Sequence, residues 1–244
     1  MAERQPARSP ATPPVVISLP FEGRWLVRNS PARRVPSHGT DLLAGRYAID
    51  FVGVDERRRT AGRRVWRTLL STEPAQRFFS YGRPILAPAD GVVVHVHDGE
   101  LDHDGRRSQL ALVPYALGQA ARLRQGVAAV AGNHVIIAVR GGDAFVALAH
   151  LRTGSIGVTV GQQVSAGQPV AGCGNSGNST QPHVHLQVMD GPDPSLARGV
   201  PLAFRRFREW PRGATRRSAV RESAVPGEGS VVESLPAPAS GERP

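Results

Sequence analysis

The stretch STQPHVHLQV, residues 179–188, contains two histidines that alternate with apolar residues. In a β-strand, residues two apart in the sequence face the same side, so His183 and His185 share one face. The apolar residues that alternate with them, from Val184 to Val188, point the other way, into a core. The stretch therefore predicts a half-buried strand that presents two imidazoles on its polar face.

The composition of the whole chain favours short strands of the same kind. Of its 244 residues, 40% are hydrophobic and only 5% are aromatic, so the core must consist mostly of Val, Leu, Ile and Ala. The 27 glycines and 21 prolines favour many strands joined by turns over long helices. We therefore expect an all-β fold.

The expected organisation is one β domain between two disordered ends. Residues 1–14 are rich in Pro, Ala and Arg and predict a disordered arm. The domain itself is expected over residues 15–205, with irregular insertions at about 55–80 and 101–130. Residues 206–244 lose the apolar periodicity and end in a Pro/Gly/Ser/Glu-rich run, so we expect a flexible tail.

Within the domain, turn signals separate the expected strands. The tripeptide Gly-Gly-Asp between two apolar runs is a hairpin signal, and a short helix is expected at residues 116–125. The strands are expected within residues 15–27, 47–54, 83–100, 133–140, 144–151, 157–174 and 182–189.

The chain is strongly basic, with a formal net charge of +10, and every basic residue is an arginine. A positive surface favours an anionic partner such as nucleic acid, an acidic cell-wall polymer or a phospholipid head group. The run from Arg57 to Arg67 either binds such a polymer or is a solvated insertion. Because few aromatic residues lie among the arginines, we expect no specific nucleic-acid partner.

Neither a secretory leader nor a membrane span is evident. Residues 1–18 contain no continuous apolar segment of the kind that a signal peptide needs. No apolar run approaches the roughly 18 residues of a transmembrane helix. The single cysteine, Cys173, excludes an internal disulfide and is expected to be a small buried residue in a glycine turn.

The two imidazoles of the opening stretch suggest a metal site. A catalytic zinc ion usually takes three protein ligands, so His185 would need two more, and His38 in a glycine loop is a candidate. Asp50 lies inside the apolar run YAIDFVGV, where an unpaired carboxylate would be costly and metal ligation would offset that cost. Asp41 lies in a loop and is the alternative carboxylate. His150 ends another apolar strand, where histidine is not the usual residue.

With these residues considered together, the chain resembles the lysostaphin/LytM-type zinc metallopeptidases. The resemblance extends over about residues 35–190, and the segments that carry it occur in the family's order. It implies a compact antiparallel β-sheet sandwich or groove domain and one zinc ion per chain. The segments are SHGTD, YAIDF, APADGVVV, GNHVII, VALAHL and VGQQVSAGQPVAGCGNSGNSTQPHVHLQV.

The resemblance also implies a role for individual residues. It implies that the zinc ligands are His38, Asp50 and His185. It implies that His150 and His183 are catalytic histidines that do not bind the metal. The spacing between His38 and Asp50 is longer than in many relatives, which keeps Asp41 as a rival ligand. Residues expected to bind substrate are Asn133, Asn175 and Ser176.

The implied function is a zinc-dependent metalloendopeptidase, a hydrolase that uses a zinc-activated water. Its expected substrates are peptidoglycan cross-links or other glycine-containing peptides, which implies extracytoplasmic or cell-wall action. An alternative is a catalytically inactive homologue that binds peptidoglycan or regulates a partner. The run VTVGQQVSAGQPV also suggests a biotinyl- or lipoyl-like carrier, but the chain has no lysine to accept the cofactor. Nothing in the sequence indicates the oligomeric state.

Three other motifs carry weaker signals. GCGNSG, residues 172–177, matches a dinucleotide-binding fingerprint, but no helix start follows it. His95 and His97 form a second His-x-His pair, interpreted as a solvent-facing pair or an adventitious metal site, because no partner is evident nearby. His134 either lines the groove or lies on an edge strand.

Overall fold

The structure is a computed structural model that describes residues 13–63, 72–106, 126–214 and 216–236. One large sheet of eleven strands dominates it, and a sheet of two strands lies beside the large one. The predicted all-β class is confirmed. The strands are β1 (Val15–Ile17), β2 (Arg24–Arg28), β3 (Ile49–Gly53), β4 (Pro84–Leu86), β5 (Gly91–His97), β6 (Asn133–Val139), β7 (Phe145–Leu151), β8 (Gln163–Val164), β9 (Pro169–Gly172), β10 (Val184–Met189), β11 (Leu202–Trp210), β12 (Ala219–Ala224) and β13 (Val231–Ser234).

Three short helices complete the described secondary structure: η1 (Leu42–Tyr47), η3 (Ala75–Arg77) and α2 (Val127–Ala131). None of the helices in the described part of the chain is long and apolar enough to cross a membrane. The helix expected at residues 116–125 lies outside the described residues, as do most of the expected N-terminal arm and part of the arginine run.

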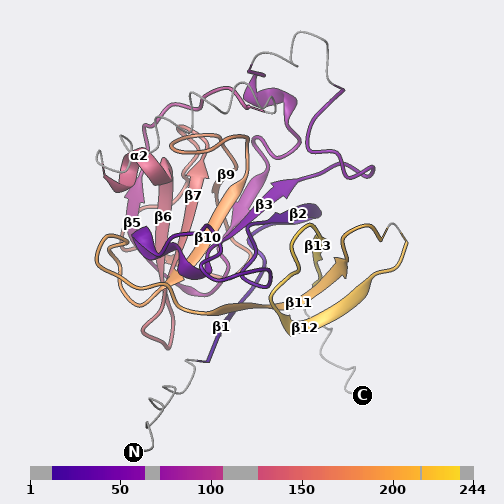
Figure 1. Ribbon diagram of the computed structural model, residues 1–244. Helices are drawn as coiled ribbons and strands as arrows, with labels where there is room; N and C mark the ends of the chain where they lie inside the picture. Colours follow the sequence, from indigo (N-terminus) through magenta and orange to yellow (C-terminus); the bar gives the residue numbers. More distant parts are fainter. Residues whose placement is uncertain (1–12, 64–71, 107–125, 215, 237–244) are drawn as a thin grey trace, which may run out of the picture.

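The large sheet brings strands from both ends of the chain to its centre. Its order is β1-β11-β13-β2-β3-β10-β7-β6-β5-β8, with β12 paired to β11. Figure 1 shows β3, β10, β7 and β6 side by side, with the yellow C-terminal strands at one side. The pairs are antiparallel apart from β1 with β11. Strand β10, which carries the opening motif, therefore lies between β3 and β7.

The two faces of β10 differ as its alternating sequence predicts. Val184, Leu186 and Val188 are fully buried in the main core. That core also contains apolar residues of the small β4–β9 sheet, which packs on the same face of the large sheet. The opposite face of β10 carries the polar side chains, so the core and the candidate site lie on opposite sides of one strand.

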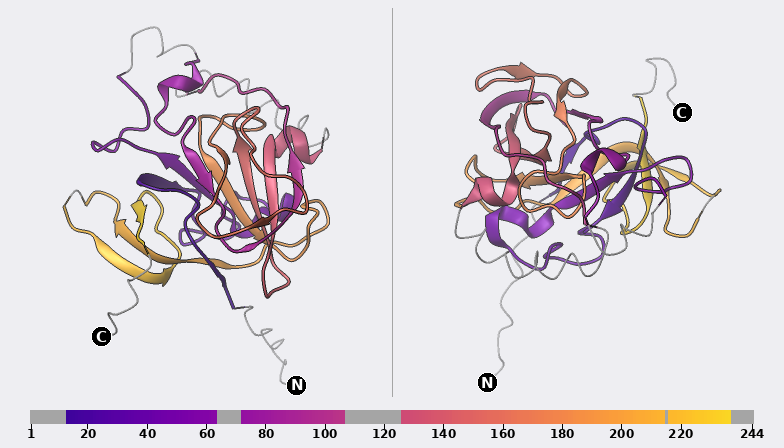
Figure 2. Two further views of the ribbon diagram at one scale, coloured as in Figure 1. Left: turned by 180° about the vertical axis from the view of Figure 1, so that it is seen from behind. Right: turned by 90° about the horizontal axis from the view of Figure 1, so that it is seen from above.

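The C-terminal strands correct the expected tail over residues 206–244. Strand β11 runs to Trp210, and β13 inserts between β11 and β2, with Val232 fully buried in the main core. Both rotated views in Figure 2 show this part of the chain packed beside the N-terminal strands. Phe204 and Phe207 both lie in the main core although they are three residues apart. Arg206 between them has a left-handed φ of 29°, which interrupts the strict alternation of the strand. The division into domains otherwise remains a prediction.

Candidate active site

The two strands that flank the opening motif bring a carboxylate beside an imidazole. His185 on β10 is the direct cross-strand partner of Asp50 on β3, so their side chains share one face of the sheet. Asp50 is 6% exposed and is the second residue of a fully buried strand. His38 reaches the same point from the loop that precedes η1.

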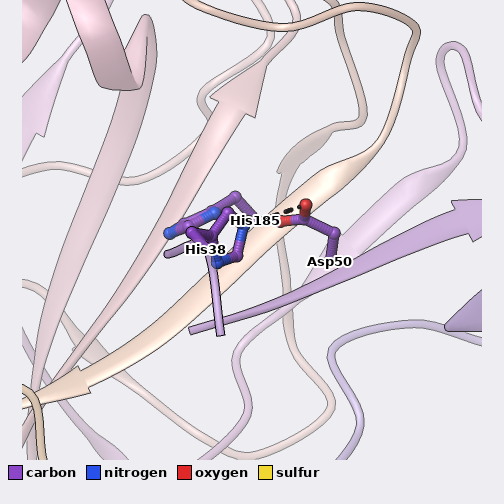
Figure 3. A group of neighbouring side chains, drawn as sticks. All are labelled: His38, Asp50 and His185. Carbon is purple, nitrogen blue, oxygen red and sulfur yellow. Dashed lines mark hydrogen bonds and ion pairs between the residues drawn. The ribbon is translucent and has the colours of Figure 1, made fainter. Parts of the chain in front are cut away.

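These three side chains point toward one another, as Figure 3 shows. His185 Nδ1 lies 2.9 Å from Asp50 Oδ1, and His38 Nε2 lies 3.1 Å from Asp50 Oδ2. One ligand atom from each residue lies within 4.8 Å of the other two, and this is the one group of that kind among the described residues. Two nitrogens and one carboxylate oxygen are a ligand set typical of zinc.

A further polar group holds each of the three in place. Ser37 Oγ is 3.0 Å from His38 Nδ1, which leaves Nε2 directed at Asp50. Gln187 Oε1 is 3.0 Å from His185 Nε2, so that nitrogen can donate and leave Nδ1 as a ligand. Asn29 donates from Nδ2 to Asp50 Oδ2 at 2.7 Å. Such outer partners orient metal-binding side chains, so the three residues fit a zinc ion.

The rival carboxylate is directed elsewhere. Asp41 is exposed on the loop and accepts two hydrogen bonds from Arg46 Nη1, at 2.9 and 2.8 Å. It is absent from the group formed by His38, Asp50 and His185. The geometry therefore brings together the set with Asp50 and leaves out the alternative set with Asp41.

Electrostatics within the group favour a charged carboxylate. Burial opposes the charge, but His38 and His183 hold the pKa of Asp50 well below its usual range. Burial alone would lower the pKa of His185, yet the hydrogen bond to Asp50 and the charge of that carboxylate raise it. A negatively charged Asp50 therefore stabilises a positive charge placed next to it.

His150 reaches the site through an irregularity in β7. Strict alternation would place it on the core face, with Leu148. Instead it has a left-handed φ of 60°, next to a register shift between β6 and β7, and it lines the same pocket as Ala149. Its Nδ1 is 3.0 Å from the carbonyl oxygen of Ser176 and donates to it, so Nε2 carries the lone pair of the ring.

His183 precedes β10 and is held in a similar way. Its Nδ1 is 2.8 Å from the carbonyl oxygen of Gln181 and 3.0 Å from Ser179 Oγ. Its Nε2 lies 3.7 Å from Asp50 Oδ1, and its ring centroid is 4.7 Å from that of His150. The Nε2 atom of His183 therefore faces the candidate metal group, and the ring of His150 lies beside that of His183.

Burial lowers the pKa of both imidazoles. It lowers the pKa of His150 well below its usual range, and the neighbouring His183 and His185 lower it further. Burial also lowers the pKa of His183, although the charge of Asp50 partly offsets this effect. A neutral imidazole with a free Nε2 can accept a proton, which is the requirement for a general base.

A single pocket joins these groups. It extends over the polar face of the sheet and is bounded by η1 on one side and α2 on another. Its walls include Val127 and Val130 of α2, and Asn178 and Thr180 from the loop before β10. The pocket is lined by all five predicted metal-binding and catalytic residues: His38, Asp50, His150, His183 and His185.

The three residues expected to bind substrate lie elsewhere. Asn133, Asn175 and Ser176 are each fully buried and do not line the pocket. Asn133 donates to the carbonyl oxygens of Glu100 and Leu151, and Ser176 Oγ donates to Leu151 at 2.8 Å. These positions correct the expectation of substrate contact, because the side chains hold neighbouring loops together behind the pocket.

The second His-x-His pair has a partner that the sequence did not reveal. His134 on β6 stacks against His95 and His97 on β5, with ring centroids 5.0 and 5.5 Å apart. These three histidines do not form a candidate metal-binding group among the described residues. His134 also lines the pocket, which agrees with the first of its two predicted positions, in the groove. Cys173 is fully buried, as expected, and burial raises the pKa of its thiol.

Sequence reasoning missed two polar residues of the site. They are Asn29, which follows β2, and Gln187, which lies on the polar face of β10. No signal in a single sequence distinguishes Asn29, because its contact with Asp50 joins residues 21 positions apart. Gln187 could have been found, because it is two residues beyond His185 on the same face.

Comparison with known proteins finds similarity to peptidases over part of the chain. Residues 115–196 match the family model described as Peptidase family M23. This segment is M23-like. It contains His150, His183 and His185, and the resemblance drawn from the sequence is thereby confirmed. No curated protein matches the chain.

Solved structures of this peptidase class also match. The catalytic domain of lysostaphin from Staphylococcus simulans is 19% identical, with a TM-score of 0.36, and the match covers 64% of this chain and 77% of that one. The catalytic domain of the prophage-encoded M23 protein EnpA from Enterococcus faecalis is 22% identical, with a TM-score of 0.36 and coverages of 63% and 73%. A zinc-containing peptidase from Vibrio cholerae is 20% identical, with a TM-score of 0.32 and coverages of 63% and 45%.

Proposed function

We propose that the chain is a zinc-dependent metalloendopeptidase that hydrolyses peptide bonds in peptidoglycan cross-links or other glycine-containing peptides. The observation that carries the proposal is one pocket that holds three candidate metal ligands and two further imidazoles whose Nδ1 atoms face backbone carbonyls. The M23 match over residues 115–196 supports the same activity. On this proposal the chain acts outside the cytoplasm, where peptidoglycan lies.

The metal ligands of the proposal are His38, Asp50 and His185. A zinc ion bound there would polarise the scissile carbonyl and lower the pKa of a water molecule to about 7. The chain's own contribution is to hold these ligands through Ser37, Asn29 and Gln187, as described above. The buried pocket also strengthens every electrostatic interaction within it.

His150 and His183 divide the proton chemistry between them. One accepts the proton of the attacking water on its Nε2, as a general base. The other, once it carries a proton on Nε2 as well as on Nδ1, donates a hydrogen bond to the oxygen that becomes negatively charged as the carbonyl is attacked. Their Nδ1 atoms are fixed to backbone carbonyls, so both rings keep the orientation that these tasks require.

Cleavage of pentaglycine and of purified cell-wall sacculi tests the proposal. The zinc-loaded chain should release new amino termini, and a chelator should abolish this release. His150→Ala should bind zinc as the wild type does and lose at least about 10²-fold in turnover, the usual contribution of a positioned acid or base. His95→Ala, outside the pocket, is the matched control and should retain activity.

The alternative of an inactive binding homologue gives a different result in the same experiment. The zinc-loaded wild-type chain would then bind sacculi and release no amino termini from either substrate. Equal turnover by the wild type and His150→Ala would contradict the roles assigned to the histidines.

A further inference from the structure

A second hollow lies beside the candidate active site, and its charge is strongly positive. We refer to it as the basic hollow, and it is lined by Leu26, Arg28, Arg33, Arg212, Glu228 and Gly229. The three arginine side chains are exposed. None of these guanidinium groups makes an ion pair within the described parts of the chain. Three unpaired arginines around one hollow predict an anionic ligand.

Contacts in its walls fix the shape of the hollow. Glu228 Oε2 accepts a hydrogen bond from the backbone amide of Ser30 at 2.8 Å, so the one acidic side chain of the lining is already engaged. The stem of Arg212 lies over Gly229, where an added Cβ would be 3.0 Å from the Arg212 Cδ atom. The absence of a side chain at Gly229 thus allows Arg212 to reach the hollow.

The basic hollow and the candidate metal group share one face of the sheet. Arg28 on β2 is the direct cross-strand partner of Asp50 on β3, so the two side chains emerge on the same side. Directly paired residues have Cβ atoms about 4.5–5.5 Å apart. The next residue, Asn29, lines the catalytic pocket and bonds to Asp50. One ligand can therefore extend from the metal group into the basic hollow.

Every residue of the hollow comes from outside the M23-like segment. Leu26, Arg28 and Arg33 belong to the N-terminal part, and Arg212, Glu228 and Gly229 to the C-terminal part. The pairing of β13 with β2 brings these two parts together. The hollow is thus a feature of the terminal strands of this chain.

We propose that the basic hollow binds a carboxylate of the substrate peptide, within a few residues of the cleaved bond, so that the enzyme prefers acidic peptides. This inference rests on the proposed peptidase function, because only then does a peptide lie across Asp50. The planar guanidinium group matches a carboxylate with two parallel hydrogen bonds, and Arg28 and Arg212 offer two such groups. A peptide carboxylate is favoured over a separate polyanion because the hollow adjoins the site where a peptide would react.

Matched peptides test this inference. Two series of glycine-containing peptides would differ only in carrying Glu or Gln at successive positions on either side of the cleaved bond. For the zinc-loaded wild type, Glu at the preferred position should lower KM about tenfold relative to Gln, with kcat unchanged, as expected for one charge-assisted hydrogen-bonded pair. Arg28→Gln, and Arg28→Gln combined with Arg212→Gln, should remove this preference.

Arg140→Gln supplies the control, because Arg140 is an exposed arginine just beyond β6 and outside the hollow. It should keep the preference, and all variants should unfold at the wild-type temperature. Equal KM values for Glu and Gln peptides at every position would overturn the inference and leave the peptidase intact. Retention of the preference in the double variant would overturn it as well.

Failure of peptide cleavage and binding of a phosphate polymer are two further outcomes. If the zinc-loaded wild type cleaves neither series, the proposed function fails; fluorescence-anisotropy binding of the same labelled peptides then tests the hollow alone, and equal affinities overturn the inference. Inhibition by soluble polyphosphate, without any preference for Glu peptides, would assign the arginines to a phosphate polymer and overturn the peptide carboxylate.

Discussion

At the scale of single residues, the candidate metal group depends on side chains that do not themselves bind a metal. Ser37, Asn29 and Gln187 each bond to one of the three ligands and fix the atom that it presents. The three residues of the group stood out in the sequence because a histidine pair on a strand and an aspartate in an apolar run are unusual. The partner Asn29 was not predictable, because its contact exists only after β2 and β3 pair.

Substitution of Asn29 by alanine should weaken zinc binding. Asp50 would lose its 2.7 Å hydrogen bond from Nδ2 and with it part of its fixed orientation. We expect the dissociation constant for zinc to rise about 10–100-fold, the usual effect of losing an outer partner. Competition with a chromogenic chelator measures it. Thr180→Val, which changes the wall of the same pocket, should leave the constant unchanged; equal effects of the two variants would contradict the prediction.

His134 should make the fold sensitive to acid. Burial lowers its pKa from 6.5 to about 4, and His95 and His97 contribute to the shift. Between these values the unfolded chain binds the proton and the folded chain does not. The free energy of unfolding should therefore fall as the pH falls from 6.5 toward 4, by up to about 3 kcal/mol.

Denaturant titrations at about pH 7 and pH 4.5 measure this loss of stability. His134→Gln removes the titrating group, so its free energy of unfolding should decrease less between the two pH values than that of the wild type. A variant that loses as much stability in acid as the wild type would show that His134 is not responsible.

At the scale of elements, the central strands can be predicted from the sequence, whereas the C-terminal strands cannot. The runs at 133–140, 144–151 and 182–189 contain patterns of apolar residues, and the structure has β6, β7 and β10 there. Strand β12 is mostly exposed, so it has no apolar face to detect. In β11, the left-handed Arg206 disturbs the alternation, and the period of two is lost.

His150 shows, inside a predicted strand, that alternation in the sequence does not always give the direction of a side chain. Its sequence position on β7 implies the core face, and only the left-handed backbone turns it into the pocket. The resemblance to the peptidase family could assign it a role, whereas strand periodicity alone could not. Local irregularities of this kind often occur beside active sites, where they re-aim a side chain.

Two valines of the C-terminal strands test whether this region belongs to the core. Val232 on β13 is fully buried, and Val220 on β12 is 48% exposed. Val232→Ala should lower the free energy of unfolding by about 2 kcal/mol, whereas Val220→Ala should change it by less than about 0.5 kcal/mol. Chemical denaturation measures both. Equal, negligible effects would restore the view of a flexible tail.

At the scale of the whole molecule, the candidate site takes residues both from the M23-like segment and from the part of the chain before it. The N-terminal part supplies His38, Asp50 and Asn29, and the segment supplies His150, His183 and His185. Phe21 stacks on Trp25 within the N-terminal part, and Phe51 packs against Phe204 of the C-terminal strands. The low aromatic content predicted an aliphatic core, and the core is mostly aliphatic, with a contact between Phe51 and Phe204 where the two ends of the chain meet.

The zinc content of the purified chain tests the central claim most directly. Elemental analysis of the wild type and His185→Ala, each exposed to zinc and then dialysed, would count the metal ions held per chain. We predict one zinc ion per wild-type chain and almost none in His185→Ala, with both proteins folded. One zinc ion per chain in the variant, or none in the wild type, would contradict the assignment of this metal site.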